Sequence, residues 1–422
     1  MLDALKNAMR IPDLRRKIIY TAAMLAVYRV GSFIPVPGVN AAALAQELGI
    51  DGGNIFGLLN LFTGGALARF TVFALGVSPY ITASIVLNLL TIVIPKLEEL
   101  SKEGPEGRKI ISQYTRYATV VLAFIQAFAT TSMARAWGVT TNPGFFGLAL
   151  ITLTLVAGTS LLMWIGDKIT EKGIGNGISL LIFLGIIAEL PTSVINAFRV
   201  AGQGGVSIIS LILYFLINLA IIAAVIVVTQ GQRRIPVQYA KRIVGRRVYG
   251  GQSTHIPLKV NQAGVIPVIF ASSVLTFPLT LTQFVPALGF INRWLGYGTF
   301  GYNVIFVALV IFFTYFYTAV TFNPMEVADN MKKNGGYVPG LRPGRPTAEY
   351  LDRVLTRITL PGAIFLAFIA VLPTLVAFIT RVPTSLLYFG GTGLLIMVGV
   401  AIETMEQIEA HLLMRHYEGF LK

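Results

Sequence analysis

The chain has 422 residues, of which 55% are hydrophobic and only 12% are charged, and its mean hydropathy is +0.73. Soluble domains carry about 25% charged residues, so this composition excludes an ordinary water-soluble globule. The 33 Lys and Arg outnumber the 19 Asp and Glu, which gives a net charge of +14, and they gather between apolar blocks. That distribution favours membrane topology or acidic partners over DNA binding.

Read in chain order, the apolar blocks predict ten membrane spans, because each approaches the roughly 20 residues that cross a bilayer. The predicted spans are 18–36, 70–94, 117–134, 145–165, 177–198, 207–229, 261–286, 302–322, 360–379 and 387–403. The basic segment 1–17 leads into the first block, and no small-residue cleavage site follows a short apolar core. We therefore expect a retained first span and not a removed signal peptide.

One further apolar segment, 54–67, is too short to cross a bilayer and contains Gly57, Gly64 and Gly65. We predict a short helix that dips back into the protein from the outer side. An ordinary outer loop with one helical turn is the alternative interpretation.

The basic residues predict the orientation of the spans. Counted by alternate loops, 27 of the 33 Lys and Arg lie on one side and 6 on the other. Since positive loops stay in the cytoplasm, we expect both termini there, together with two basic loops, about 230–260 and 323–359.

Ten spans also divide into halves of five, 1–203 and 204–422. An odd number of spans per half permits an inverted repeat with a path between the halves. The alternative is that the chain has ten spans without such symmetry.

The predicted spans contain almost no groups for ion coupling or catalysis. Arg29 lies late in the first span, where it could snorkel outward, Glu189 lies in the fifth, and Glu403 lies at the last membrane exit. The sequence has no cysteine, its three histidines are far apart outside the apolar blocks, and it has no GxxxxGK[ST] nucleotide loop. These features argue against a pump, a proton-coupled carrier, an intramembrane protease, a metal site or a bound cofactor. They favour a path that is apolar at its narrowest point and powered by a partner. A secondary transporter with inverted repeats and a structural scaffold remain the alternatives.

Six strings resemble the SecY family, the pore subunits of bacterial-type protein-export translocases. They are GSFIPVPG (31–38), ISQYTRY (111–117), ITEKGIGNGIS (169–179), GRRVY (245–249), QSTHIPLKVN (252–261) and FNPMEVADN (322–330). The resemblance extends from about residue 11 to 417. It implies an all-α protein of ten spans in two inverted halves around an hourglass pore. Such a pore conducts unfolded secretory polypeptides and is not an enzyme.

The resemblance also implies a closed pore with two barriers. A ring of aliphatic side chains is expected from Val77, Ile81, Ile178, Ile182, Ile269 and Ile396. The segment 54–67 is expected to be a plug under that ring, with Ile55, Phe56, Leu58, Leu59, Leu61, Phe62, Gly64 and Gly65. An aliphatic ring hinders water and ions by dewetting, since it offers no fixed ligand.

A lateral exit for hydrophobic segments is implied between the second and third spans and the seventh and eighth. Thr82, Gln126 and Asn261 are small polar residues suited to holding such a seam shut by weak hydrogen bonds, each worth about 0.6 kcal/mol.

The two basic loops are expected to carry the partner chemistry. Guanidinium groups bind carboxylates and phosphates bidentately, and the candidate docking residues are Arg233, Arg234, Arg246, Arg247 and Arg342. Arg342 lies in the string PGLRPG (339–344), whose Pro and Gly predict a stiff tip. Topology and binding of anionic lipids are the simpler explanation for the charge of these loops. The resemblance implies the SecA ATPase, the ribosome with its RNA, and small SecE and SecG membrane subunits as partners. It also implies secretory polypeptides with signal sequences as cargo and the plasma membrane as location.

Overall fold

The computed structural model describes residues 8–47, 55–203, 206–239, 242–244, 247–249, 253–284, 289–296, 299–380 and 391–419. Within these ranges the chain is mainly helical, which confirms the predicted fold class. The long helices are α2 (Pro12–Gly31), α5 (Ser78–Val93), α7 (Pro105–Ala136), α8 (Phe145–Lys172), α9 (Gly177–Gly202), α10 (Ile208–Gln230), α11 (Ile266–Phe284), α13 (Phe300–Thr321), α15 (Arg345–Thr380) and α16 (Gly391–Gly419). The short ones are α3 (Ala41–Glu47), α4 (Ile55–Phe62), α6 (Pro95–Lys102), α12 (Gly289–Leu295) and α14 (Pro324–Lys333).

Proline and asparagine determine where several helices begin. Proline occupies one of the first two positions of α2, α5, α6, α7 and α14. Its fixed φ suits a first turn, where its missing N–H leaves no bond unmade. The Asn176 side chain caps α9 by accepting hydrogen bonds from the N–H groups of Ile178 and Ser179, at 3.1 and 3.3 Å. These local signals fix the entry of each helix into the bundle.

Seven helices in the described ranges are long and apolar enough to cross a membrane, or eight if the pair α5–α6, bent by 99°, forms one span. They coincide with eight of the ten predicted spans. The predicted span 18–36 coincides with α2, which carries five charged residues. The predicted span 261–286 coincides with α11, which has an apolar stretch over Ile266–Leu279, the part whose side chains the structure describes without a gap. The number ten therefore stays a prediction.

Several predicted boundaries are wrong. The second predicted span begins at residue 70, but α5 begins at Ser78, because Phe70 and Gly76 have positive φ angles of 43° and 58° in the turns before it. Helices α15 and α16 run well beyond the apolar blocks 360–379 and 387–403, and residues 381–390 lie outside the described ranges. Charged residues limit an apolar block without ending a helix, so hydropathy marks the membrane edge and not the helix end.

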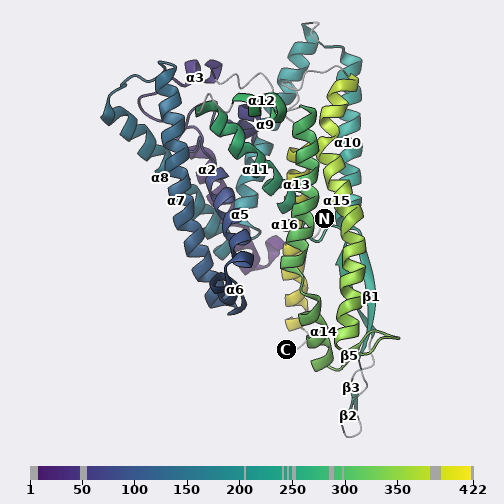
Figure 1. Ribbon diagram of the computed structural model, residues 1–422. Helices are drawn as coiled ribbons and strands as arrows, with labels where there is room; N and C mark the ends of the chain where they lie inside the picture. The colour runs from purple at the N-terminus through teal and green to yellow at the C-terminus, as the bar shows by residue number, and fades with distance from the viewer. Residues whose placement is uncertain are drawn as a thin grey trace.

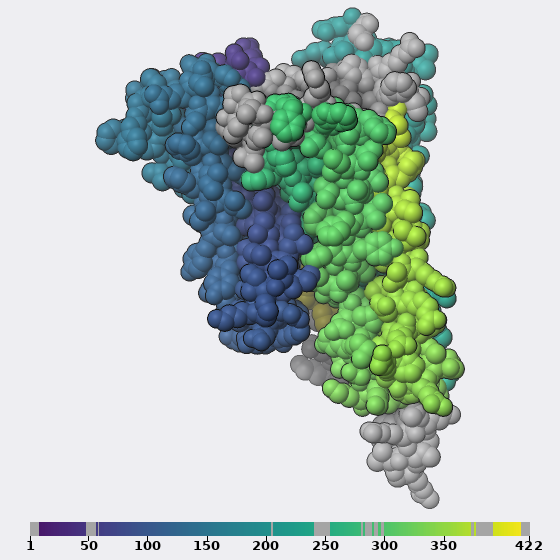
Figure 2. All heavy atoms as spheres, in the orientation of Figure 1, coloured from purple at the N-terminus to yellow at the C-terminus, as the bar shows by residue number. Residues whose placement is uncertain are grey.

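The helices form two groups that meet along the middle of the molecule. Figure 1 shows α7 and α8 at one side and α10 and α15 at the other, with α5, α9, α11 and α16 between them. Helices α5 and α11 are in contact across the middle, as are α9 and α16. Figure 2 shows the atoms of the two groups, blue and green, meeting on the front face. The predicted division at 203 and 204 remains a prediction.

A small β structure extends from one end of the bundle (Figure 1). Strands β1 (Gln232–Tyr239) and β4 (Ser253–Lys259) pair antiparallel, and β5 (Gly336–Tyr337) joins the other edge of β1. Strands β2 (Arg242–Val244) and β3 (Arg247–Tyr249), which lie between β1 and β4 in the sequence, pair antiparallel with each other. The basic segment 230–260, expected to be a loop, is therefore largely paired strand. Alternate side chains of β1 point into a separate small core with α14 and α15.

Candidate functional site

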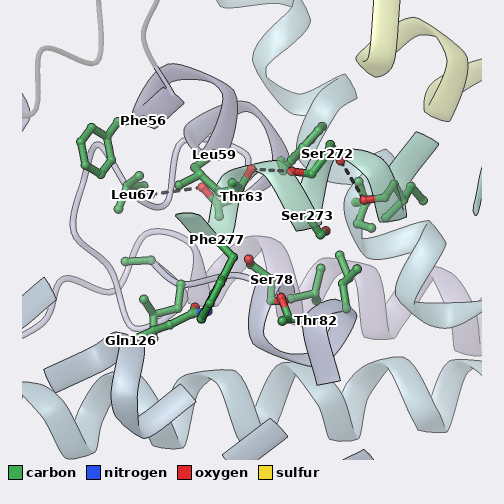
Figure 3. A pocket seen from close by; sticks show the side chains of 18 of the residues that line it. Phe56, Leu59, Thr63, Leu67, Ser78, Thr82, Gln126, Ser272, Ser273 and Phe277 are labelled. Atoms are coloured by element: carbon green, nitrogen blue, oxygen red, sulfur yellow. Dashed lines mark hydrogen bonds between the residues drawn. The ribbon is translucent and has the colours of Figure 1, made fainter. Parts of the chain in front are cut away.

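A cavity of about 100 Å³ lies where helices of the two groups meet, beside the short helix α4 (Figure 3). Aliphatic side chains from four helices line it: Val77 and Ile81 at the start of α5, Ile182 of α9, Ile269 of α11 and Ile396 of α16. All five are buried in one hydrophobic core. Among the described residues that line the cavity, none is charged. The structure thus brings together five of the six residues predicted for the ring.

Ile178 is the predicted ring residue that lies apart. It is only partly buried at the start of α9 and does not line the cavity. Its side chain fills the space beside Gly166 of α8, where an added Cβ would overlap it. One helical turn separates Ile178 from Ile182, and the cavity reaches only the second of them. The structure therefore gives Ile178 a packing contact between α8 and α9.

Helix α4 covers one side of the cavity. Phe56, Leu59 and Phe62 line it, while Leu61 is buried in the main core. The side chains of Ile55 and Leu58 lie outside the described part of the chain. The helix ends at Phe62, earlier than the predicted limit of 67.

Two glycines explain the early end of α4. Gly64 and Gly65 have positive φ angles of 63° and 80°, which glycine adopts without steric cost and which end a right-handed helix. The side chain of Asn60 then accepts a hydrogen bond from the N–H of Ala68 at 2.8 Å and fixes the return of the chain. The predicted glycine-rich segment is therefore a short helix followed by a tight, hydrogen-bonded turn.

Two of the residues predicted for a lateral seam lie at the same cavity. Thr82 of α5 and Gln126 of α7 line it, opposite Ser272, Ser273, Thr276 and Phe277 of α11. Figure 3 shows the Phe277 ring extending toward Gln126. These α11 residues were not among the predicted seam residues, although the small polar residues before Phe277 are a signal for close helix packing.

Hydrogen bonding at the seam differs from the expectation. Thr82 donates to the carbonyl of Ser78 at 3.1 Å, and Thr276 donates to the carbonyl of Ser272 at 2.7 Å. Each of these hydroxyl groups is thus satisfied by its own helix. The contact of α5 with α11 rests on packing and not on hydrogen bonds between these hydroxyls.

Asn261 lies apart from Thr82 and Gln126. It is buried, with 5% exposure, in the turns before α11, and it does not line the cavity. Its Oδ1 atom has no hydrogen-bond partner among the described residues. The structure therefore brings two of the three predicted seam residues together.

The predicted docking arginines lie at the end of the molecule that carries the strands. Arg233 and Arg234 are exposed on β1, and Arg247 begins β3, while Arg246 lies outside the described residues. Arg342 is exposed in the turn between β5 and α15.

The turn around Arg342 is held by its own backbone. Gly340 and Gly344 have φ angles of 83° and 100° on either side of Arg342. The carbonyl oxygen of Arg342 accepts a hydrogen bond from the Thr347 side chain at 2.8 Å. The side chain of Arg342 is thus exposed in a turn that has glycines and a hydrogen bond of its own, and its role in docking stays a prediction.

The described residues contain no group of three or more His, Asp or Glu side chains that could hold a metal ion. What the arrangement offers is an apolar constriction between two helix groups, covered on one side by a short helix, with basic surfaces at one end.

Comparisons with known proteins identify a family and related structures for this chain. The SecY family matches residues 71–405. The chain is similar to the protein translocase subunit SecY of Mycobacterium tuberculosis, at 50% identity over 446 residues and 100% of both chains. A solved structure of a protein-conducting channel covers 94% of this chain and 92% of its own, with a TM-score of 0.70 and 19% identity. Sec61 in the canine ribosome–channel complex from the endoplasmic reticulum matches with the same coverage, a TM-score of 0.64 and 17% identity. At such identities the structural matches show the fold alone.

Proposed function

The chain belongs to the SecY family and is the channel subunit of a protein translocase, and from this premise we propose that translocated polypeptides pass through the aliphatic cavity between its two helix groups. It is a multi-pass membrane protein and a pore, not an enzyme. The observation that supports the proposed path is the convergence of Val77, Ile81, Ile182, Ile269 and Ile396 on one uncharged cavity.

The aliphatic ring acts as a seal in the resting channel. Its side chains offer water and ions no hydrogen bond or charge, so a narrow gap between them dewets. The same side chains carry no polar group, so they form no hydrogen bond with a passing chain and yield to it. Ile178 takes part through its packing against α8.

Helix α4 acts as the plug. It places Phe56, Leu59 and Phe62 against the cavity, and it is only eight residues long, so few contacts must break when it moves away. The contact of α5 and α7 with α11 acts as the lateral gate through which hydrophobic segments leave. Asn261, in the turns before α11, belongs to the same lateral gate in this proposal.

The basic end of the molecule faces the cytoplasm and docks the partner that drives transport. Arg233, Arg234, Arg246, Arg247 and Arg342 offer guanidinium groups to the acidic surface of the SecA ATPase or to ribosomal RNA. SecE and SecG complete the complex in the plasma membrane, both chain termini lie in the cytoplasm, and anionic lipids bind the remaining basic surface. The likeness to a Sec61 channel seen with a ribosome supports the ribosome as one partner.

A single cysteine tests the path, since the natural chain has none. Ile182→Cys is placed in the ring, a secretory polypeptide carrying one cysteine is arrested halfway, and the cross-link between the two chains is measured. We expect a cross-link that requires both a signal sequence and an energy source. Leu213→Cys, at an exposed position of α10, is the matched control and should not react. A cross-link at Leu213 with none at Ile182 would move the path away from the cavity and contradict the proposal.

A further inference from the structure

The turn that ends α4 is held from α2 by two consecutive side chains. Tyr28 donates its hydroxyl hydrogen to the carbonyl of Thr63 at 3.1 Å. Arg29 donates from Nη1 to the carbonyl of Gly64 at 2.9 Å. Both carbonyls belong to the chain directly after the last residue of α4. The charge of Arg29, expected to snorkel outward, is instead directed to the backbone of the plug.

A second anchor reaches the same turn from α9. Glu189 accepts a hydrogen bond and forms an ion pair with Arg69, with 3.3 Å between Oε1 and Nη2. The same Glu189 oxygen occupies the space that a Cβ on Gly65 would need. One helical turn earlier in α9, a Cβ on Gly185 would lie 2.5 Å from the carbonyl oxygen of Phe62. The turn is therefore in direct backbone contact with α9.

The two anchors are joined through one aromatic ring. The guanidinium carbon of Arg29 lies 4.8 Å from the centre of the Phe33 ring, and that of Arg69 lies 4.6 Å from it. A guanidinium over an aromatic ring is attracted by its quadrupole. Two arginines with a single carboxylate, that of Glu189, thus converge on a segment of three residues, Thr63 to Gly65.

Charged residues within membrane segments are costly, and they are usually retained for function. Aliphatic packing alone would hold α4 in place, as it does for Leu61. The charge-assisted hydrogen bond from Arg29 to the Gly64 carbonyl and the neutral one from Tyr28 to the Thr63 carbonyl add something different, because hydrogen bonds depend on direction and break within a small displacement. Such contacts suit a segment that must have one defined resting position and must also leave it.

We propose that Arg29, Arg69 and Glu189 are positioning residues that latch the C-terminal end of the plug to α2 and α9 in the idle channel. The proposal rests on the proposed function of α4 as the plug. The latch acts on the turn and not on the ring, so it sets how often α4 leaves its resting position. Opening breaks the Arg29–Gly64 and Arg69–Glu189 contacts, and the channel reseals when they form again.

The test compares ion conductance of the idle, full-length channel, purified with its membrane partners and reconstituted in planar bilayers. Arg29→Ala and Glu189→Gln should each raise the idle conductance about tenfold, because a charge-assisted hydrogen bond contributes about one decade to an equilibrium. Arg29→Lys should stay near the natural chain. The double variant Arg69→Glu with Glu189→Arg should restore the seal that either single reversal loses. Arg135→Ala, at an exposed arginine ending α7, is the control for loss of positive charge.

Two further measurements separate the possible failures. The melting temperature of each variant in detergent should match that of Arg135→Ala, since a general loss of structure would also leak. Deletion of residues 55–63 reports on the plug itself. If the deletion raises conductance but Arg29→Ala and Glu189→Gln do not, the latch is wrong and the plug stands. If the deletion leaves conductance unchanged, the assignment of α4 as the plug fails, and the latch fails with it.

Discussion

Glycine allows two neighbouring segments to approach closely at Gly158 and at Gly177. A Cβ on Gly158 of α8 would overlap the carbonyl oxygen of Val72, in the turns before α5. A Cβ on Gly177, the first residue of α9, would overlap the carbonyl oxygen of Gly166. In both cases the neighbour is backbone, which cannot move aside as a flexible side chain would. These glycines are therefore required by close approach, and they hold the start of α5 and of α9 beside the cavity.

Substitution of Gly158 tests this close packing. We expect Gly158→Ala to lower the free energy of unfolding by about 1–3 kcal/mol, the usual cost of forcing extra volume into a packed site. Thermal denaturation of the purified protein in detergent measures the change. Gly202→Ala, at the end of α9, has no described atom within 4 Å of the new Cβ and should change little. Equal stability of the two variants would contradict the packing account.

The sequence alone could place individual site residues only through the family resemblance. Val77 and Ile81 are four residues apart, but aliphatic pairs at this spacing occur on every buried helix face. Ile269 and Ile396 lie far from them in the chain, and no local pattern connects the three helices involved. Conversely, nothing in the spacing of Ile178 and Ile182 distinguishes the residue that reaches the cavity from the one that packs against Gly166.

At the scale of elements, the seam between α5 and α11 combines satisfied hydroxyl groups with one large ring. Thr82 bonds within its own helix, whereas the Phe277 side chain extends across the seam toward Gln126. Phe277 is still 37% exposed, so its packing contributes only part of the roughly 3–5 kcal/mol of a fully buried ring. The ring, and not the hydroxyl, should therefore determine how easily the seam parts.

Two substitutions separate these contributions. Thr82→Val keeps the shape of the side chain and should leave the signal-sequence requirement of export unchanged. Phe277→Ala should increase export of a substrate with a defective signal sequence about tenfold, which corresponds to about 1.4 kcal/mol. The rate of export into membrane vesicles, with natural and defective signals, is the measurement. A larger effect of Thr82→Val than of Phe277→Ala would show that polar contacts hold the seam.

Most elements follow from the sequence, and the exceptions have identifiable causes. Long apolar blocks such as 207–229 coincide closely with helices, here α10, because a membrane span must satisfy its backbone internally. Segments 70–77 and 261–265 belong to predicted spans and yet form turns, since positive φ at Gly76 and Gly264 interrupts them. The antiparallel pair of β1 and β4 escaped prediction because the alternation of Ile235 and Val237 is short and follows directly on Arg233 and Arg234.

At the scale of the whole molecule, the basic end is one compact body and not two separate loops. Side chains from β1 and β4, including Ile235 and Leu258, share a core with three residues from the following segments. These are Met331 of α14, Val338 directly after β5, and Leu351 of α15. The turn that presents Arg342 lies between two members of this core. A partner that binds the turn therefore acts on the strands and on α15 at once.

Charge reversal at the turn tests docking. Arg342→Glu should strongly impair export driven by the SecA ATPase, while the channel still inserts and folds, because the side chain is exposed and the turn is held by its backbone. ATP-dependent export into vesicles and the amount of folded protein in the membrane are measured together. Arg353→Glu, exposed on α15, is the control for net charge. Export at the normal rate in Arg342→Glu would contradict the proposed docking role.

Helix α15 connects the basic end of the molecule with the helices near the seam. It runs unbroken through 36 residues, which corresponds to about 54 Å and exceeds the roughly 30 Å of a bilayer core. One end belongs to the docking body, and along its length it contacts α13, which in turn contacts α11 at the seam. We expect such a helix to carry a displacement of one end along its length, with any bending concentrated at Pro361 and Pro373, which lie inside it. If a partner binds and tilts the basic end, the tilt would pass through α15 to α13 and α11, and the seam with α5 would part without any chemistry in the membrane.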